Sequence, residues 1–163
     1  MKRLPLDNVL TLDELMALRQ QFKSENRIVV FTNGVFDIIH PGHVAYLTEA
    51  KELGSVLIVG LNSDESVKML DKGTNRPIQN EDARAVVLSA LKPVDFVVCF
   101  DDETPENLIT SITPDILVKG GDYAIEDIVG SDHVLKSGGE VKQLQFIDGY
   151  STSAIERKIK NAD

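Results

Sequence analysis

Residues 27–43 read RIVVFTNGVFDIIHPGH, and this stretch decides the fold. Its first part, Arg27–Thr32, is rich in β-branched and aromatic side chains without alternation, which is typical of a strand buried on both faces. After a loop, the segment HVAYLTEAKEL that starts at His43 predicts a helix ending before Gly54. A buried strand, a loop and a helix in this order indicate the first unit of an α/β sheet.

Alternating strands and helices continue on both sides of this stretch. Further buried strands are predicted at residues 55–61, 94–100, 115–119 and 140–144. Polar residues at the predicted helix starts are expected to be N-caps: Thr11, Ser63, Asn80 and Ser151. We therefore expect an α/β fold with a mostly parallel five-stranded sheet. It should form a single domain over residues 1–163, with an N-terminal helix in residues 1–25 before the first strand.

The bulk composition excludes several classes of protein. A net charge of −9 disfavours binding to a nucleic-acid backbone, although a locally positive pocket could still hold a small anion. Without an apolar run long enough to cross a bilayer, no membrane partner is expected and the cytoplasm is the default location. The single cysteine, Cys99, excludes an internal disulfide framework.

Two histidines, His40 and His43, stand at the predicted start of the helix that follows the first buried strand. Residues three apart on a helix can face the same way, and the helix N-terminus adds N–H donors and a partial positive charge. Gly34 and Gly42 allow the backbone to approach a ligand closely. The arrangement favours a triphosphate site. A zinc site would need further ligands, which the lone cysteine in an apolar strand does not supply.

Two later segments follow predicted strands and should reach the same edge of the sheet. The turn GYSTS, residues 149–153, brings hydroxyls and N–H groups to the start of the last helix, as a phosphate site or as a simple N-cap. The turn KGGDY, residues 119–123, joins a cation, flexible backbone and a carboxylate. From both turns we expect contacts with the nucleotide by Lys119, Gly120, Asp122, Ser151, Thr152 and Ser153.

Cations that could grip phosphate groups lie between the second predicted strand and the next helix. Lys72 and Arg76 belong to the aperiodic segment 71–77, and Arg76 can form two parallel hydrogen bonds with a phosphate. A solvated charged loop is the alternative. Arg84 lies on the following helix, where a contact with the substrate and an ion pair with a nearby acid are equally compatible with the sequence.

The motif His40-Pro-Gly-His43 resembles the HxGH signature of the cytidylyltransferase-like nucleotidyltransferases, a family with a Rossmann-like three-layer fold. The GYSTS turn resembles the hydroxyl-rich C-terminal motif of that family. KGGDY, VGLNSDESVK and DDETPENLI resemble one branch, the adenylyltransferase domains that make ADP-heptose for lipopolysaccharide. This resemblance implies that both histidines contact the triphosphate and that Asp37 lies beside the second substrate. It further implies a nucleotide pocket lined by Thr32, Asn33, Gly34 and Phe36.

The combined expectation is transfer of AMP from ATP to a sugar 1-phosphate, with heptose 1-phosphate preferred on the resemblance. His40, His43 and Lys72 would be catalytic, and Mg²⁺ would bridge phosphate oxygens rather than occupy a carboxylate cage. The resemblance also implies a homodimer. The alternatives are a cytidylyltransferase acting on glycerol 3-phosphate and a non-catalytic nucleotide-binding regulator. A redox dinucleotide domain is disfavoured because no GxGxxG follows the first buried strand.

Overall fold

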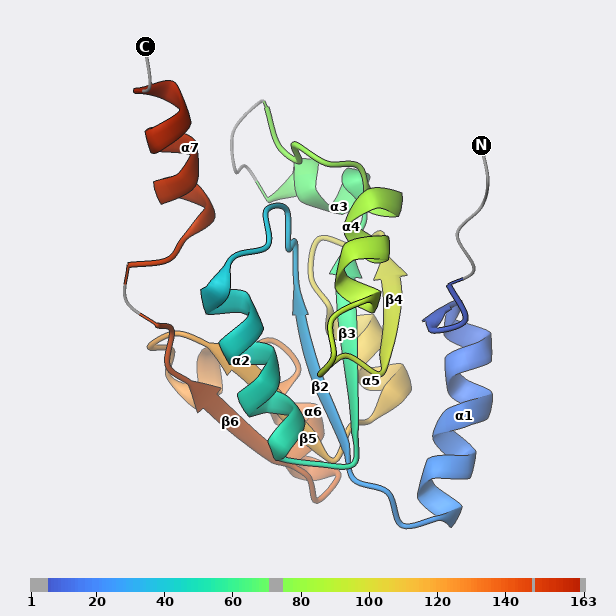
Figure 1. The fold of residues 1–163 in the computed structure, drawn as a ribbon. Helices are drawn as coiled ribbons and strands as arrows, with labels where there is room; N and C mark the ends of the chain where they lie inside the picture. The colour runs from blue at the N-terminus through green and yellow to red at the C-terminus, as the bar shows by residue number, and fades with distance from the viewer. Residues whose placement is uncertain (1–5, 71–74, 148, 162–163) are drawn as a thin grey trace.

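The computed structural model describes residues 6–70, 75–147 and 149–161, which form a six-stranded sheet in the order β1-β4-β3-β2-β5-β6 (Figure 1). All neighbouring strands are parallel. The strands are β1 (Val9–Leu10), β2 (Val29–Gly34), β3 (Val56–Asn62), β4 (Phe96–Phe100), β5 (Ile116–Gly120) and β6 (Glu140–Leu144). The predicted α/β fold with a parallel sheet is confirmed.

The expected number of five strands is wrong, because β1 adds a sixth. This strand has only two residues, which pair with Val97 and Val98 of β4. Two residues are too few to display an alternation or an apolar run, so only the pairing with a distant strand defines them. In the described part of residues 1–25, a strand therefore precedes the predicted helix.

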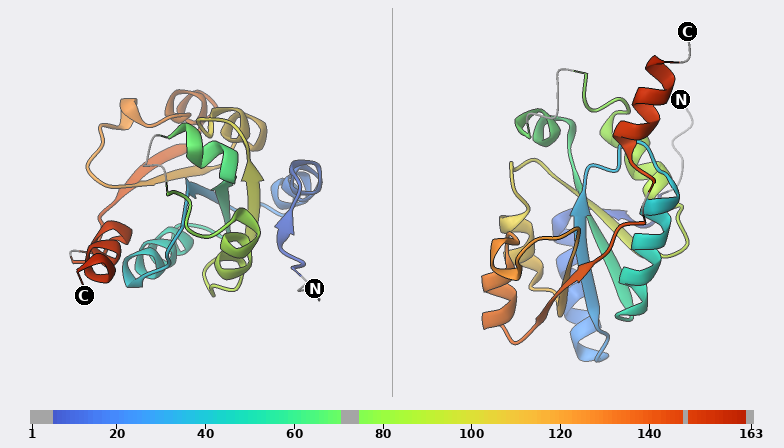
Figure 2. Two further views of the ribbon diagram at one scale, coloured as in Figure 1. Left: turned by 90° about the horizontal axis from the view of Figure 1, so that it is seen from above. Right: turned by 90° about the vertical axis from the view of Figure 1, so that its left-hand side faces the viewer.

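Helices cover both faces of the sheet and make three layers (Figure 2). Their bounds are α1 (Leu12–Ser24), α2 (Pro41–Glu52), α3 (Asp64–Met69), α4 (Glu81–Ser89), α5 (Glu106–Ile112), the 3₁₀ helix η1 (Ile125–Asp127), α6 (Ser131–Lys136) and α7 (Thr152–Lys160). One buried cluster joins α1, α5 and α6 to the sheet, and a second joins α2 and α4 to its other face. Burial on both faces explains why the strands lack alternation.

The predicted caps are confirmed at all four helix starts. Thr11 forms a capping box with Glu14, and the side chains of the other three residues each accept a backbone N–H three residues further on; these three are Ser63, Asn80 and Ser151. The N-cap of α5 is Pro105, which makes no side-chain cap hydrogen bond. Local side-chain chemistry therefore determines most of the helix starts.

Gly130 lies between the 3₁₀ helix η1 and helix α6. This glycine has a φ of 82°, in the left-handed region that side chains rarely adopt. A Cβ atom there would lie 2.8 Å from two side-chain carbons of Ile109 on α5. The chain turns here so that α6 can pack on the sheet next to α5.

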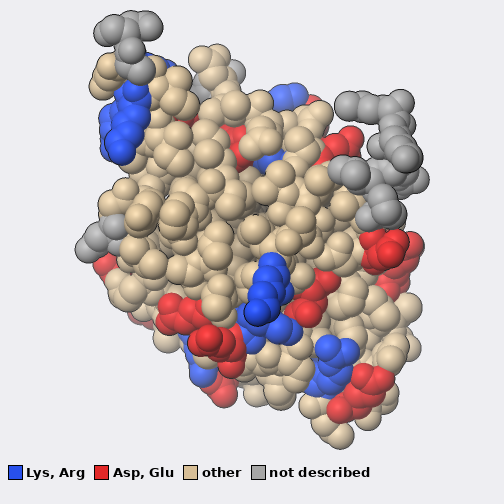
Figure 3. All heavy atoms as spheres, in the orientation of Figure 1, with Lys and Arg blue, Asp and Glu red and all other residues tan. Residues whose placement is uncertain are grey.

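Because the strands are parallel, the loops that follow them emerge at one edge of the sheet. The N-termini of α2 and α7 lie at this edge (Figures 1 and 2). In the space-filling view, basic side chains gather on α7, whereas the surface over the N-terminal half of α2 is largely uncharged (Figure 3). Among the described residues, we find no helix with the length and apolar character needed to cross a bilayer.

Candidate active site

The two predicted catalytic histidines lie together at the N-terminus of α2. His40 is the N-cap, and its Nδ1 accepts a hydrogen bond from the backbone N–H of His43 at 3.4 Å. The two imidazole rings are stacked, with their centroids 3.8 Å apart and an interplanar angle of 19°. Since Nδ1 of His40 is an acceptor, its proton belongs on Nε2, which remains a donor for a ligand.

Both imidazoles are neutral at physiological pH. Burial, with a smaller contribution from the neighbouring His40, lowers the pKa of His43 to about 4. Burial also lowers the pKa of His40. Within the described chain, Nδ1 of His43 is buried without a hydrogen-bond partner. The pair can therefore bind anionic oxygen through neutral N–H groups, aided by the partial positive charge of the helix N-terminus.

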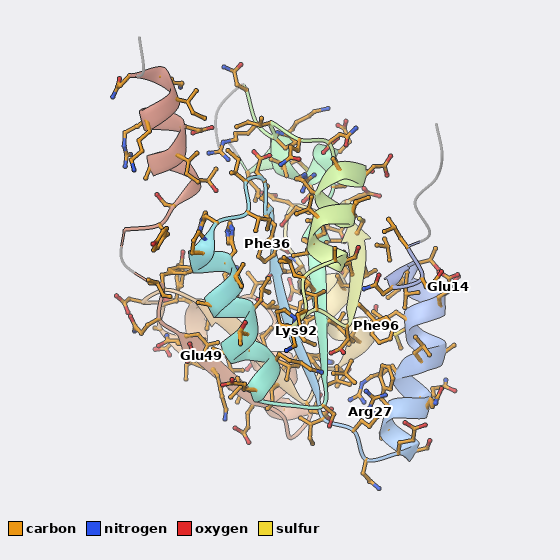
Figure 4. All side chains as sticks on the ribbon, viewed as in Figure 1. Glu14, Arg27, Phe36, Glu49, Lys92 and Phe96 are labelled. Atoms are coloured by element: carbon orange, nitrogen blue, oxygen red, sulfur yellow. The ribbon has the colours of Figure 1, made fainter. Side chains whose placement is uncertain are left out.

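The loop between β2 and α2 packs against the histidines. Phe36, labelled in Figure 4, has a φ of 47°, an uncommon conformation for an aromatic residue. Its ring packs against His43 at 5.1 Å between centroids, and a Cβ atom on Gly34 would lie 2.9 Å from it. The Phe36 side chain is almost fully buried and fills the space between His43 and the end of β2.

Asp37 and Arg76, both predicted to bind the second substrate, bind each other at 3.0 Å. The buried Asp37 carboxylate also accepts hydrogen bonds from the backbone N–H groups of Ile78 and Gln79. Arg76 makes a second ion pair with Glu156 of α7 at 2.9 Å. Both residues are therefore engaged with the protein, and any contact with substrate stays a prediction.

Arg84 requires a correction, because its side chain is completely buried and faces the protein. Its guanidinium donates to the backbone carbonyls of Val35, Asn62 and Gln79 at 2.7–2.9 Å. It also forms an ion pair with Asp64 at 2.7 Å. Of the two alternatives left open by the sequence, the ion pair is the one formed.

Thr32 also differs from its expected role in nucleotide binding. The residue is fully buried, and its hydroxyl lies 2.6 Å from that of Tyr46 on α2. The Tyr46 hydroxyl donates onward to the carbonyl of Val118, so Thr32 is the donor to Tyr46. Burial raises the pKa of Tyr46 to about 12. Thr32 thus fixes α2 to the sheet through a hydrogen-bonded pair.

The start of α7, predicted to bind phosphate, lies against the start of α2. A Cβ atom on Gly42 would lie 3.3 Å from Cβ of Tyr150, the residue before the hydroxyl turn. Ser151 caps α7 by accepting the backbone N–H of Ala154. Two helix N-termini therefore lie close together beside the histidines. Their partial positive charges favour the binding of an anion. Phosphate contacts by Ser151, Thr152 and Ser153 stay predictions.

On the other side of the end of β2 lies a cavity of about 250 Å³. Two predicted nucleotide-binding residues, Asn33 and Lys119, line it together with Pro105, Leu117, Tyr123, Asp127, Ile128 and Val129. The neighbouring predicted residues lie outside it: Phe146 covers Gly120, and Asp122 accepts a hydrogen bond from Gln145. The KGGDY turn therefore contributes two residues, Lys119 and Tyr123, to the lining of the cavity.

Lys72 falls outside the described residues. Within the described ranges, no cluster of three or more His, Cys, Asp and Glu side chains could hold a metal ion. No sequence pattern indicates the role of Glu156, because its partner Arg76 lies 80 positions earlier in the chain. Tyr46 carried a signal that was missed, since a tyrosine on the buried face of a helix usually has a polar partner.

The stacked neutral histidines lie between two helix N-termini at the carboxyl edge of a parallel sheet, an arrangement that is typical of the nucleotidyltransferase class. Comparison with known proteins then identifies the family. The cytidylyltransferase-like family matches residues 31–158, and this chain belongs to it.

Several known proteins are similar to this chain. The bifunctional protein HldE of Wolinella succinogenes is 52% identical over 96% of this chain, which corresponds to 32% of that protein. HldE of Marinomonas sp. is 58% identical over 80% of this chain and 27% of that protein. The chain thus spans about a third of the length of the curated relatives that it matches.

Two solved structures extend the comparison. The lipopolysaccharide core biosynthesis protein of Thermoplasma volcanium has a TM-score of 0.61 at 30% identity, covering 77% of this chain and 99% of that one. Pantothenate synthetase of Thermus thermophilus has a TM-score of 0.59 at 13% identity, covering 92% of this chain and 70% of that one. The second likeness concerns the fold alone.

Proposed function

We propose that this chain transfers AMP from ATP to a heptose 1-phosphate, releasing pyrophosphate and forming ADP-heptose. The observation that carries this proposal is the neutral His40–His43 pair between two helix N-termini, at the edge of the sheet where a cavity of about 250 Å³ also lies. The likeness to bifunctional protein HldE supports the choice of acceptor. So does the resemblance of KGGDY and its neighbours to adenylyltransferase domains that make ADP-heptose.

In the proposed reaction an oxygen of the sugar phosphate attacks the α-phosphorus of ATP. A new P–O bond forms, the bond to the β-phosphate oxygen breaks, and pyrophosphate takes the electron pair. The attacking phosphate is already ionised, so no protein nucleophile is needed. Catalysis then consists of positioning and of stabilising negative charge. The Nε2 proton of His40 and the N–H groups of α2 and α7 are the donors proposed for this charge.

The proposed place of the nucleoside of ATP is the cavity beside Asn33 and Lys119, the two lining residues predicted to bind the nucleotide. Its polar lining suits the ribose, because Asn33, Tyr123 and Asp127 offer an amide, a hydroxyl and a carboxylate for ribose hydroxyls. The cation of Lys119 suits the phosphates. Asp37 and Arg76 are the residues proposed for the acceptor. Nucleotidyltransferases generally require a divalent cation, and we propose Mg²⁺ bound with the phosphates of ATP. A homodimer is proposed on resemblance alone, and light scattering would measure it.

The test measures pyrophosphate release with ATP or CTP, each paired with heptose 1-phosphate or glycerol 3-phosphate. We expect release only with ATP and heptose 1-phosphate, and a loss of at least about 100-fold in His40→Ala. His133→Ala on α6 is the matched control and should retain activity. Release only with CTP and glycerol 3-phosphate would establish the cytidylyltransferase alternative. Tight nucleotide binding without turnover would favour the regulator.

A further inference from the structure

Helix α7 carries the hydroxyl turn at its start but is weakly packed against the rest of the molecule. None of its residues is fully buried. Ile155 is half-buried, and Ile159 is 67% exposed. Figures 1 and 2 show the helix extending beyond the carboxyl edge of the sheet. Apolar burial therefore contributes little to its position, which needs another physical cause.

An ion pair links α7 to the catalytic loop. Oε2 of Glu156 lies 2.9 Å from Nη2 of Arg76, and Nη1 of the same guanidinium lies 3.0 Å from Oδ2 of Asp37. The side chains of Glu156 and Arg76 are only 27% and 15% exposed, so solvent screens their attraction less than that of a surface pair. Among the residues that the structure describes, no other side chain of α7 forms an ion pair.

The far end of this link is rigid. Asp37 is buried in the loop between β2 and α2, and the backbone N–H groups of Ile78 and Gln79 hold its carboxylate. The same loop places Phe36 under His43. Arg76 therefore connects α7 directly to the loop between β2 and α2, which packs against the catalytic histidines.

The link also sets the rotation of α7 about its axis. Thr152 and Glu156 are four residues apart and lie on the same face of the helix. Thr152 is half-buried, whereas Ser153 is exposed. We propose that Glu156, acting through Arg76, is a positioning residue that holds the hydroxyl turn against the histidines and so sets the affinity for the nucleoside triphosphate.

This inference rests on the proposed function, in which the turn binds the triphosphate. The test compares Glu156→Gln with Glu52→Gln, the same chemical change at an exposed position near the end of α2. Two readouts are measured: kcat and KM for ATP, and hydrogen exchange of the amides in residues 151–160. For Glu156→Gln we expect KM to rise about fivefold with kcat changed by less than about twofold, because the reacting groups stay in place. Exchange in α7 should become faster. Glu156→Asp should recover part of the affinity.

An unchanged KM with unchanged exchange in Glu156→Gln would overturn the inference. So would a loss of kcat at constant KM, or the same effects in Glu52→Gln. If the wild-type chain shows no turnover, the proposed function fails, and hydrogen exchange with and without ATP still decides the role of Glu156. In that case, protection of residues 151–160 by ATP in the wild type but not in Glu156→Gln would support it, and equal protection would refute it.

Discussion

Replacing Arg84 by methionine should destabilise the fold strongly. The substitution keeps a long flexible side chain but removes every donor of the guanidinium. The carbonyls of Val35, Asn62 and Gln79 lose their partner, and Asp64 loses its counter-ion. Breaking a buried charge pair by removing one partner costs about 3–5 kcal/mol. Asp64 is 30% exposed and can be solvated, which places the expected loss at the lower end of that range.

The assay is urea denaturation monitored by circular dichroism. The free energy of unfolding is obtained from the midpoint of the transition and its dependence on urea concentration. Arg84→Lys should lose about 2 kcal/mol, because a single ammonium cannot reach all four acceptors. Arg157→Met is the matched control on the exposed surface of α7 and should stay within about 0.5 kcal/mol of the wild type. A loss below about 1 kcal/mol in Arg84→Met would refute the role assigned to this residue.

Two further predictions concern pH and backbone strain. The pKa of His43 is about 4 in the fold and 6.5 in the unfolded chain, so the unfolded state binds more protons between these values and stability should fall as pH is lowered through that window. For the free energy of unfolding, urea denaturation should show a loss on the order of 2 kcal/mol after solvent screening, and a smaller loss in His43→Asn, where only His40 still contributes. Gly130→Ala should cost about 2–4 kcal/mol, since it adds a clash with Ile109 to an unfavourable φ. Gly138 has a similar φ but open space around it, so Gly138→Ala should cost only about 1 kcal/mol. Calorimetric melting of both variants measures the two losses. Equal losses would show that the contact with Ile109 does not contribute.

The parts of the molecule that sequence predicts well are those that local chemistry determines. The stretch Arg27–His43 contains its own strand, its loop and its helix start, and Ser151 caps α7 with its own hydroxyl. The histidine pair belongs to this group, because a spacing of three at a helix start brings two rings together. Each of these features depends on residues only a few positions apart.

The residues whose contacts the sequence does not predict depend on distant partners. Arg84 could face a ligand or the protein, and the choice is made by carbonyls 22 and 49 positions earlier. Thr32 follows a β-strand pattern, but only the position of Tyr46 shows that its hydroxyl is already bonded. A cation or a hydroxyl near a motif is therefore a weak indicator of ligand binding until its protein partners are known.

The two apolar clusters on opposite faces of the sheet have a consequence for how this family can diversify. Phe36 and Tyr46, beneath the histidines, belong to the cluster under α2, whereas Leu117 and Ile128 of the cavity belong to the cluster under α5 and α6. No buried side chain is shared between the two clusters. Substitutions of cavity residues in one cluster therefore need no repacking of the other cluster, which lies under the histidine pair. The two faces of the sheet can vary, and be engineered, separately.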